Sequence, residues 1–263
     1  MIRNIIHQKA TRLFIILAAV FIANALIAEL IGVKIFSLET SLGWQPVGWK
    51  ILGQEFSFNL TAGVLLWPVV FILTDIINEY YGPRGVRFLS FMAAGVIAYS
   101  FFVFWLAIGL TPAAFWARNY FTGVSDSNTA FAAVLGQGQS IIIGSLAAFV
   151  LGQLLDVAVF HRIKKMTGER AIWLRATGST LVSQFVDSFV VLFIAFYVAP
   201  RITGASQPWP FAQVMAICIG NYIYKFVVAL LLTPVIYGVH AWVEKYLGHH
   251  TATDLKRAAM QNE

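Results

Sequence analysis

The sequence predicts an all-α membrane protein with six transmembrane helices and both termini in the cytoplasm, and three observations lead to this class. Of the 263 residues, 59% are hydrophobic and 11% are charged, whereas a soluble domain carries about 25% charged residues. The apolar residues fall into six long runs. The basic residues alternate between the segments that connect these runs, as expected when the segments lie on opposite sides of a membrane.

Each of the six runs is long enough to cross a bilayer, which needs roughly 20 apolar residues. They cover about residues 12–36, 60–81, 86–109, 131–160, 172–199 and 210–243. The first run could instead belong to a signal peptide, because Ala23-Asn24-Ala25 resembles a cleavage site, but apolar sequence continues past it to Phe36. We therefore predict one transmembrane domain over 1–248 and a polar, disordered cytoplasmic tail over 249–263.

The distribution of Lys and Arg sets the orientation of the helices. Thirteen of the 18 basic residues fall in the two termini and in the two connections on the same side, four fall on the opposite side, and Lys225 lies within the last run. Cytoplasmic segments carry the excess of basic residues, which places both termini in the cytoplasm. This asymmetry also explains the net charge of +6, so we expect no nucleic-acid partner.

Two local features can be predicted outside the polar motifs. In the long outward loop 37–59, the residues from Lys50 to Phe58 are expected to pair as a short hairpin at the membrane surface. Pro68 and Pro234 fall inside the second and sixth runs. Proline removes a backbone hydrogen bond within a helix, so a kink is expected at each.

The most informative polar residues lie at the end of the second run. Asp75, Asn78 and Glu79 are spaced i, i+3 and i+4, so a helix presents all three on one face. A charge in hydrocarbon costs about 2.5–3.5 kcal/mol even on the lenient insertion scale, so this face is expected to line a hydrated interior and to bind a ligand or a coupling ion. Alternatively, the two carboxylates end the helix near the headgroups and pair with Arg84 or Arg87.

Polar residues recur in the other runs. Gln184 and Asp187 have a Gln-x-x-Asp spacing, which places an amide and a carboxylate on one helix face. Lys225, four residues after Asn221, lies near mid-membrane and needs a carboxylate partner, for which Asp187 is the depth-matched candidate. A secondary set consists of Asn24, Glu29, Gln153 and Asp156. We expect the polar groups of the second, fifth and sixth runs to converge on one shared hydrated pocket.

These residue types suit a planar heterocycle. A carboxylate accepts two parallel N–H bonds from the edge of a guanine-like base, an amide pairs with the carbonyl oxygen of the base, and aromatic rings supply stacking. The same groups could carry a proton, a sodium ion or a zwitterion, and spacing alone does not choose between them.

Catalysis and metal binding have little support in the sequence. All five histidines lie at the ends of runs or in terminal segments, so none is available at mid-depth as a general base or metal ligand. The sequence contains no nucleophile-elbow, zinc-protease or phosphate-loop motif. Cys218 is the single cysteine, which excludes a cysteine metal cluster. We predict no catalytic residue, metal or cofactor; an intramembrane enzyme and a purely structural protein are the disfavoured alternatives.

Three segments resemble one known family, the queuosine precursor transporters, also described as vitamin-uptake-transporter-like. They are PVVFILTDIINEYYG (68–82), SQFVDSFV (183–190) and NYIYKFVVALLLTPVIY (221–237), which are similar to the family's motifs in the second, fifth and sixth helices. The resemblance runs from about residue 12 to 245, although GPRGVR after the second helix is less basic than the family's turn. It implies a six-helix, multi-pass protein of the bacterial inner membrane.

The resemblance further implies import of 7-deazaguanine precursors of the tRNA nucleoside queuosine, such as 7-cyano-7-deazaguanine and its aminomethyl form. Carried onto this chain, the substrate cavity would contain Asp75, Asn78, Glu79, Gln184, Asp187, Asn221 and Lys225. An acidic residue, Asp187 or Glu79, would accept the guanidine-like edge of the base. An amide from Gln184, Asn78 or Asn221 would meet the carbonyl group.

Two further points concern charge and partners. Lys225 would neutralise the unliganded cavity or relay the coupling charge. The main alternative is the substrate-binding subunit of an energy-coupling-factor-type vitamin importer, which needs separate ATPase chains; the small-residue stripe of Gly144, Ala148 and Gly152 would then dock a coupling subunit instead of packing against a helix. The expected partners are the deazapurine and membrane lipid, and a homo-oligomer is compatible with the sequence.

Overall fold

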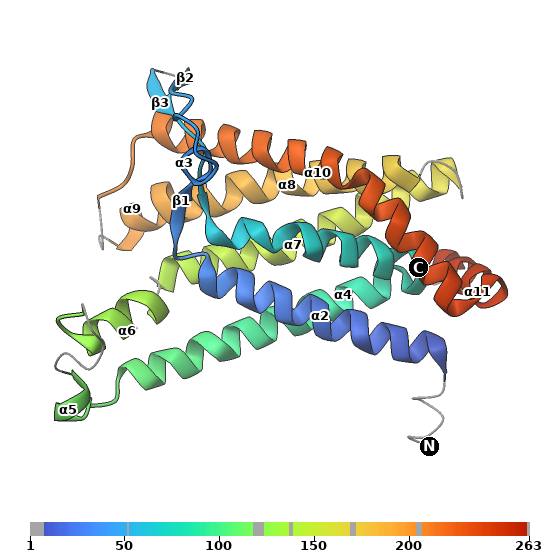
Figure 1. Ribbon diagram of the computed structural model, residues 1–263, viewed down its shortest axis with the longest axis horizontal. Coiled ribbons are helices and arrows are strands. Elements are labelled where there is room, and N and C mark those ends of the chain that lie inside the picture. Colours follow the sequence, from blue (N-terminus) through green and yellow to red (C-terminus); the bar gives the residue numbers. More distant parts are fainter. Residues whose placement is uncertain are drawn as a thin grey trace.

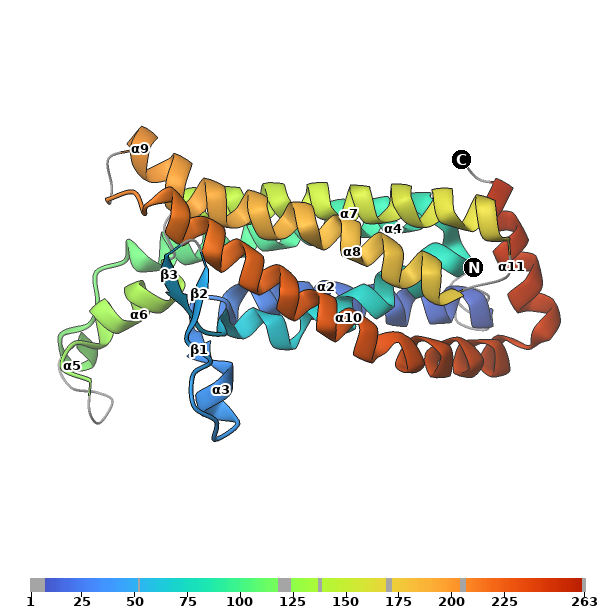
Figure 2. The ribbon, with the colours of Figure 1, turned by 90° about the horizontal axis from the view of Figure 1, so that it is seen from above.

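The structure, a computed structural model, is a bundle of long helices that run side by side (Figure 1). It describes residues 8–51, 53–117, 124–136, 139–168, 172–203 and 207–261, so the first seven residues of the predicted cytoplasmic N-terminus lie outside the described part. Four short strands lie at one end of the bundle, here called the strand end, and helix α11 (His249–Gln261) lies at the other, here called the α11 end (Figures 1 and 2).

Five of the described helices are long and apolar enough to cross a membrane, which makes the chain a multi-pass membrane protein. They are α2 (Lys9–Ile31), α4 (Trp67–Ile108), α7 (Gln139–Thr167), α8 (Ile172–Leu192), which continues through the π-helical turn η2 (Phe193–Val198) into α9 (Ala199–Thr203), and α10 (Phe211–Leu247). Short helices α5 (Ala114–Ala117) and α6 (Ser127–Leu135) connect α4 to α7 at the strand end. Large apolar side chains such as Phe88, Phe91 and Leu231 face outward, as expected for surfaces that contact lipid.

Helix α4 contains most of the second predicted run, from Trp67 on, and most of the third. Its 42 residues would extend about 63 Å at 1.5 Å per residue, about twice the thickness of the hydrocarbon core. The chain instead reverses at Gly82, whose φ of 75° and ψ of 179° lie in a region that essentially only glycine adopts. Figure 1 shows the two parts of α4 running in opposite directions from this point.

Two further predicted runs have clearly different limits in the structure. The first, 12–36, was predicted too long, because α2 ends at Ile31 and the chain then enters strand β1 (Ile35–Ser37). The fourth, 131–160, is interrupted at Gly136, with α6 before it and α7 after it.

The two prolines behave differently from each other. Pro68 was expected to kink a helix but lies in the first turn of α4, where the missing N–H has no helical partner to lose. Pro234 lies inside α10, and Figures 1 and 2 show a bend in the second half of α10, which contains it.

The strands form two antiparallel pairs. Strand β1 pairs with β4 (Asn59–Thr61), and β2 (Trp49–Ile51) pairs with β3 (Gln54–Phe56), which confirms the predicted hairpin. Between β1 and β2, helix α3 (Leu38–Ser41) carries Glu39, whose Oε1 accepts a hydrogen bond from the backbone N–H of Phe58 at 2.8 Å. A 3-10 turn, η1 (Ala62–Leu65), then leads into α4.

The prediction of a disordered tail is wrong, because residues 249–261 form α11. Ala252 and Ala259 are buried and Leu255 packs against the core, so the helix is amphipathic and covers α4 at the turn that contains Gly82. Lys256 of α11 also forms an ion pair with Glu244 of α10 at 2.6 Å. The apolar residues Ala252, Leu255 and Ala259 within the polar tail indicate this buried face in the sequence.

The small-residue stripe on α7 is confirmed as a packing surface. A Cβ at Gly144 would lie 2.9 Å from Ile194, and a Cβ at Gly152 would lie 3.7 Å from Cβ of Asp187. Ala148, between them, is 1% exposed. The stripe therefore allows α7 to approach α8 and its continuation closely, and this face is not available to an external subunit.

Candidate functional site

A cavity of about 160 Å³ lies between the helices near the strand end. We call it the strand-end cavity. Its wall comes from α2, η1, α4, α7, α8 and α10, and its polar side chains include Glu29, Ser145, Asp187, Ser188, Asn221 and Lys225. Gly63 helps to shape this wall, because a Cβ there would lie 2.6 Å from the carbonyl oxygen of Ala28. Only glycine lets η1 approach α2 this closely.

An ion pair between α8 and α10 faces this cavity. Nζ of Lys225 lies 2.6 Å from Oδ2 of Asp187, which confirms the predicted pairing. The two side chains are 14% and 22% exposed, respectively. A charge pair that is not sealed from solvent can exchange one partner for a polar ligand at lower cost than a fully buried pair.

Three further groups in the cavity have the chemistry to bind a planar polar molecule. Asn221 donates its Nδ2 to the carbonyl oxygen of Ile217 at 2.9 Å, which leaves its side-chain oxygen as an acceptor. Glu29 accepts a hydrogen bond from Ser145. Trp67 contributes an indole ring, which is stacked on Phe71 with a centroid distance of 6.1 Å. The cavity thus combines carboxylates, an ammonium group, an amide and an aromatic face.

A second polar group lies deeper in the bundle, where α4 packs against α7 and α8. We call it the buried cluster, and it consists of Thr74, Asp75, Asn78, Glu79, Gln153, Asp156, Lys164, Arg175, Ser183 and Gln184. All of these residues are less than a tenth exposed. Because polar groups at such sites need partners, the contacts within the cluster decide what each residue can do.

Glu79 is neutralised by two cations. Its carboxylate oxygens lie 2.8 Å from a guanidinium nitrogen of Arg175 and 3.0 Å from Nζ of Lys164. Lys164 also donates to the backbone oxygen of Glu79, and Arg175 donates to the carbonyl of Gly168 at 2.7 Å. The alternative in which Glu79 pairs with Arg84 or Arg87 near the headgroups is therefore not the arrangement observed.

Sequence reasoning missed the roles of Arg175 and Lys164. Both were assigned to the basic cytoplasmic loop, yet Arg175 is 0% exposed and Lys164 is 1% exposed. A signal was present, because the carboxylate of Glu79 inside an apolar run requires a cation, and basic residues at neighbouring helix ends were the available donors.

Other members of the cluster lack such compensation. Within the described residues, neither oxygen of Asp75 has a hydrogen-bond partner, and the same is true of both side-chain polar atoms of Asn78 and of Oε1 of Gln184. Nearby, Asp156 accepts from Ser183 at 3.3 Å, and its carboxylate is close enough to repel that of Asp75. A buried group without a partner costs about 1–3 kcal/mol, so these side chains are the ones with free capacity to bind.

Two small cavities lie between the strand-end cavity and the buried cluster. Each has a volume of about 10 Å³, roughly the space for one water molecule. The first shares Trp67 and Lys225 with the strand-end cavity. The second shares Phe71 and Ala229 with the first and reaches Asp75. Small separate spaces along α4 and α10 therefore lie between Lys225 and Asp75.

The structure thus distributes the predicted residues over two places instead of one shared pocket. The strand-end cavity contains Asp187, Asn221, Lys225 and the secondary residue Glu29. The buried cluster contains Asp75, Asn78, Glu79, Gln184 and the secondary residues Gln153 and Asp156. Asn24 belongs to neither, and its side-chain amide donates to the carbonyl of Val20 on its own helix at 2.8 Å.

The chain is similar to known membrane transporters. The family model described as "Putative vitamin uptake transporter" matches residues 61–239. The "Probable queuosine precursor transporter" of Bacillus subtilis is 31% identical over 70% of this chain and 73% of that protein. Its counterpart in Haemophilus influenzae is 28% identical over 71% and 70% of the two chains, and the "Queuosine precursor transporter" of Escherichia coli is 28% identical over 69% and 73%. No solved structure matches significantly.

Proposed function

We propose that this chain, which belongs to the family described as putative vitamin uptake transporters, carries queuosine precursors across the membrane. Its curated relatives are named as transporters and not as enzymes, which agrees with the sequence-based expectation of no catalytic residue. The observation that carries the proposal is the strand-end cavity, because it unites a carboxylate, an amide and an indole ring on four or more helices of the bundle. This combination fits a 7-deazaguanine base.

We further propose six passes through a bacterial inner membrane, with α4 counted twice and both termini in the cytoplasm. The reversal at Gly82 supports the count. The start of α2 and all of α11 lie at the same end of the bundle (Figure 1), as an even number of passes requires. The excess of basic residues on that side supports the orientation.

In this proposal, Asp187 accepts the guanidine-like edge of the base. Its carboxylate pairs with Lys225 and faces the strand-end cavity. Both oxygens of Glu79 are already held by Lys164 and Arg175, which makes Glu79 the weaker of the two acidic candidates. The ring N–H and the 2-amino group of the base would replace the ammonium of Lys225, and a carboxylate receives two parallel N–H donors well.

Lys225 and Trp67 would complete the first binding position. When no base is present, Lys225 neutralises Asp187, so the cavity does not hold an unpaired charge. When the base enters, the released ammonium group can donate to the carbonyl oxygen of the base. Trp67, which lines the cavity, would supply an aromatic surface for the ring of the base.

The narrow cavities between α4 and α10 suggest the onward path. A base is too large for either of them, so passage requires α4 and α10 to separate near Phe71 and Ala229. Asn78 and Gln184, which have side-chain polar atoms without partners in the described chain, would then bind the base next. Asp75 would carry the coupling ion, because a buried carboxylate without a hydrogen-bond partner and close to Asp156 is stabilised by a proton or a cation.

The test is uptake of radiolabelled 7-cyano-7-deazaguanine into proteoliposomes that contain this chain alone, with and without a proton gradient. We expect uptake that Asp187→Asn reduces by about tenfold or more, since a hydrogen bond to a charged group contributes about 1.5–3 kcal/mol. The matched control is Asp254→Asn, which changes an exposed carboxylate on α11.

Three results would count against the proposal. Wild-type rates of uptake in folded Asp187→Asn protein would remove Asp187 from the site. Absence of uptake by the chain alone, with uptake restored by separate ATPase and coupling chains, would favour the vitamin-importer subunit instead. Absence of binding of any 7-deazaguanine would reject the substrate class.

A further inference from the structure

The buried cluster carries one more negative than positive charge among the described residues. It contains the three carboxylates of Asp75, Glu79 and Asp156 and the two cations of Lys164 and Arg175. Both cations contact Glu79, whereas the carboxylate of Asp75 lies close enough to that of Asp156 for the two to repel each other. Because a buried charge needs a partner of opposite sign, the cluster can accept one further positive charge.

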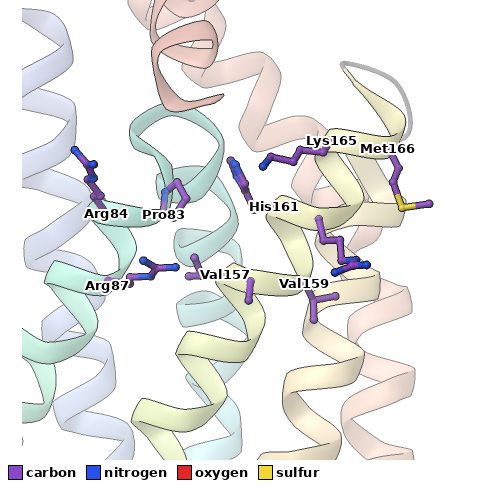
Figure 3. Close-up of a pocket in the computed structure, with 10 residues that line it drawn as sticks. Pro83, Arg84, Arg87, Val157, Val159, His161, Lys165 and Met166 are labelled. Atoms are coloured by element: carbon purple, nitrogen blue, oxygen red, sulfur yellow. The ribbon is translucent and has the colours of Figure 1, made fainter. Parts of the chain in front are cut away.

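Basic residues outside the cluster do not supply this charge to Asp75. Arg87 and Lys165 line the largest cavity among those described, about 740 Å³, where the second part of α4 faces the last turns of α7 (Figure 3). That cavity shares no lining residue with the small cavity that Asp75 lines. Asp75 is buried, and neither of its carboxylate oxygens has a hydrogen-bond partner in the described part of the chain. The additional charge therefore has to come from a bound ion.

The small cavity beside Asp75, here called the Asp75 cavity, has the size and the oxygen atoms of an ion site. Its volume is about 10 Å³, roughly the space for one water molecule. Its polar lining residues are Asp75 from α4 and both Thr177 and Thr180 from α8, and the rest of its wall is apolar. The two threonines are three residues apart, so they lie on one face of α8, and both are buried.

The hydrogen bonds around the Asp75 cavity make Thr177 an acceptor. Thr233 of α10 donates its hydroxyl to the carbonyl oxygen of Ala229 at 3.3 Å. The hydroxyl of Thr177, 3.2 Å from that of Thr233, is therefore the donor in the contact between the two threonines. Since a hydroxyl group has one proton and two lone pairs, Thr177 has lone pairs but no proton to offer to the cavity. Thr177 and Asp75 thus line the same space as acceptors, an arrangement that a cation stabilises.

We propose that the Asp75 cavity binds one sodium ion through the carboxylate of Asp75 and the hydroxyl oxygens of Thr177 and Thr180. Oxygen ligands suit a hard cation, and a deficit of one charge calls for a monovalent ion. A sodium ion contacts several oxygen acceptors at once, whereas a proton on Asp75 would satisfy one of them. A space for about one water molecule favours sodium over the larger potassium ion.

The sodium ion lies beside the proposed path of the base. Asn78 follows Asp75 by three residues on α4, and Gln184 follows Thr180 by four residues on α8, so both amides lie one turn from the Asp75 cavity on the same helix faces. This step rests on the proposed function, in which these amides bind the base and Asp75 carries the coupling ion, and it identifies that ion as sodium. Sodium neutralises the carboxylate next to the amides, so a neutral base does not meet an unpaired charge there.

The experiment measures thermal unfolding of substrate-free protein in detergent with sodium, potassium or choline chloride at constant ionic strength. Sodium alone should raise the midpoint of wild type, because a ligand that binds the folded state stabilises it. Asp75→Asn should abolish this rise. Thr180→Val, which removes one oxygen with little change of shape, should raise the sodium concentration at half effect about tenfold. The control is Thr167→Val on α7, which removes a hydroxyl that donates to the carbonyl of Ile163 and should respond as wild type does.

Failure of the sodium site and failure of the proposed substrate are distinguishable. An equal response of wild type to the three salts, or a sodium response that persists in Asp75→Asn, overturns the site even where 7-cyano-7-deazaguanine is taken up. A sodium response that depends on Asp75 and Thr180, without uptake of any 7-deazaguanine, supports the site and rejects only the substrate. Where uptake is present, an inward sodium gradient at constant pH should stimulate it, and uptake that does not respond to the gradient would overturn the role of sodium as coupling ion.

Discussion

The two ion-paired regions of the bundle use the same chemistry under different degrees of burial. In the strand-end cavity, Asp187 and Lys225 form a pair whose side chains are 22% and 14% exposed. In the buried cluster, Glu79 holds Lys164 and Arg175 with all three side chains at most 2% exposed. The first pair can release a partner to a ligand, whereas the second would leave an unpaired charge in a dry interior. Burial, more than residue type, therefore separates the carboxylate that we propose to bind the substrate from the one that holds helices together.

The largest expected effect is on the stability of the fully buried ion-paired region. Arg175→Met leaves Glu79 with Lys164 alone, and loss of one partner from a buried ion pair costs about 3–5 kcal/mol. We expect a large fall in the midpoint of thermal unfolding in detergent, measured by loss of monodisperse protein. Arg12→Met, which removes an exposed cation from α2, should leave the midpoint unchanged. A stable Arg175→Met protein would mean that the cluster does not hold α4 to α8.

In the strand-end cavity, Lys225→Met should change the selectivity for substrates more than the stability of the protein. The substitution leaves Asp187 without its cation, so the strand-end cavity becomes more negative and favours a positively charged substrate. We expect the uptake ratio of the aminomethyl form to the cyano form to rise about tenfold, the effect of about 1.4 kcal/mol of charge interaction. Competition between the two substrates in proteoliposomes measures it. An unchanged ratio would show that Lys225 and the substrate do not share Asp187.

A smaller effect is expected at the connection between the two regions. Ala229 lines both narrow cavities, and Ala229→Leu would fill them. Uptake should fall roughly fivefold, because overpacking would add about 1 kcal/mol to the activation barrier for passage. Binding at the strand-end cavity should remain. Val235→Leu, a similar enlargement at a position that is 46% exposed on the same helix, is the control. Equal transport by the two variants would place the path elsewhere.

The smallest effect concerns a carboxylate outside the membrane-spanning helices. Burial raises the pKa of Glu39, but hydrogen bonds from the backbone of Phe58 and Val47 and from Ser37 outweigh this and lower its pKa below the ordinary 4.5. A lowered pKa stabilises the fold above pH 4.5, and this contribution is lost as the pH falls through the pKa of the folded state.

At pH 7, Glu39→Gln should therefore lower the free energy of unfolding by about 1 kcal/mol or less. The variant should accordingly unfold at a lower temperature than wild type. The difference between the two proteins should shrink as the pH falls below 4.5 and disappear once the pH is below the pKa of Glu39 in the folded protein. Thermal unfolding at a series of pH values measures it, and a difference that persists in acid would assign the effect to shape instead of charge.

Much of the bundle could be predicted because hydrocarbon imposes simple rules on composition and charge. The long apolar runs predicted the helices, and the solitary position of Lys225 predicted its pairing with Asp187. The pairing followed because an isolated ammonium group at that depth has few partners. The same rule, applied to Glu79, would have led to Arg175.

The remaining differences come from tertiary contacts that a linear pattern does not contain. Whether the polar groups of several helices meet at one place depends on helix rotation and tilt, so Asp75 and Asp187 lie in different sites although both are polar residues in apolar runs. The disorder predicted for 249–261 gave too much weight to polar composition, because α11 needs only Ala252, Leu255 and Ala259 on one face to pack.

The contact between α11 and the turn at Gly82 has a practical consequence for work on this protein. A Cβ at residue 82 would lie 3.1 Å from the backbone oxygen of Ala259, so the last helix rests directly on the point where the chain changes direction. A fluorescent protein or affinity tag fused after the C-terminus is therefore attached close to this contact. Labels in the strand hairpin, at the opposite end of the bundle, are far from the turn.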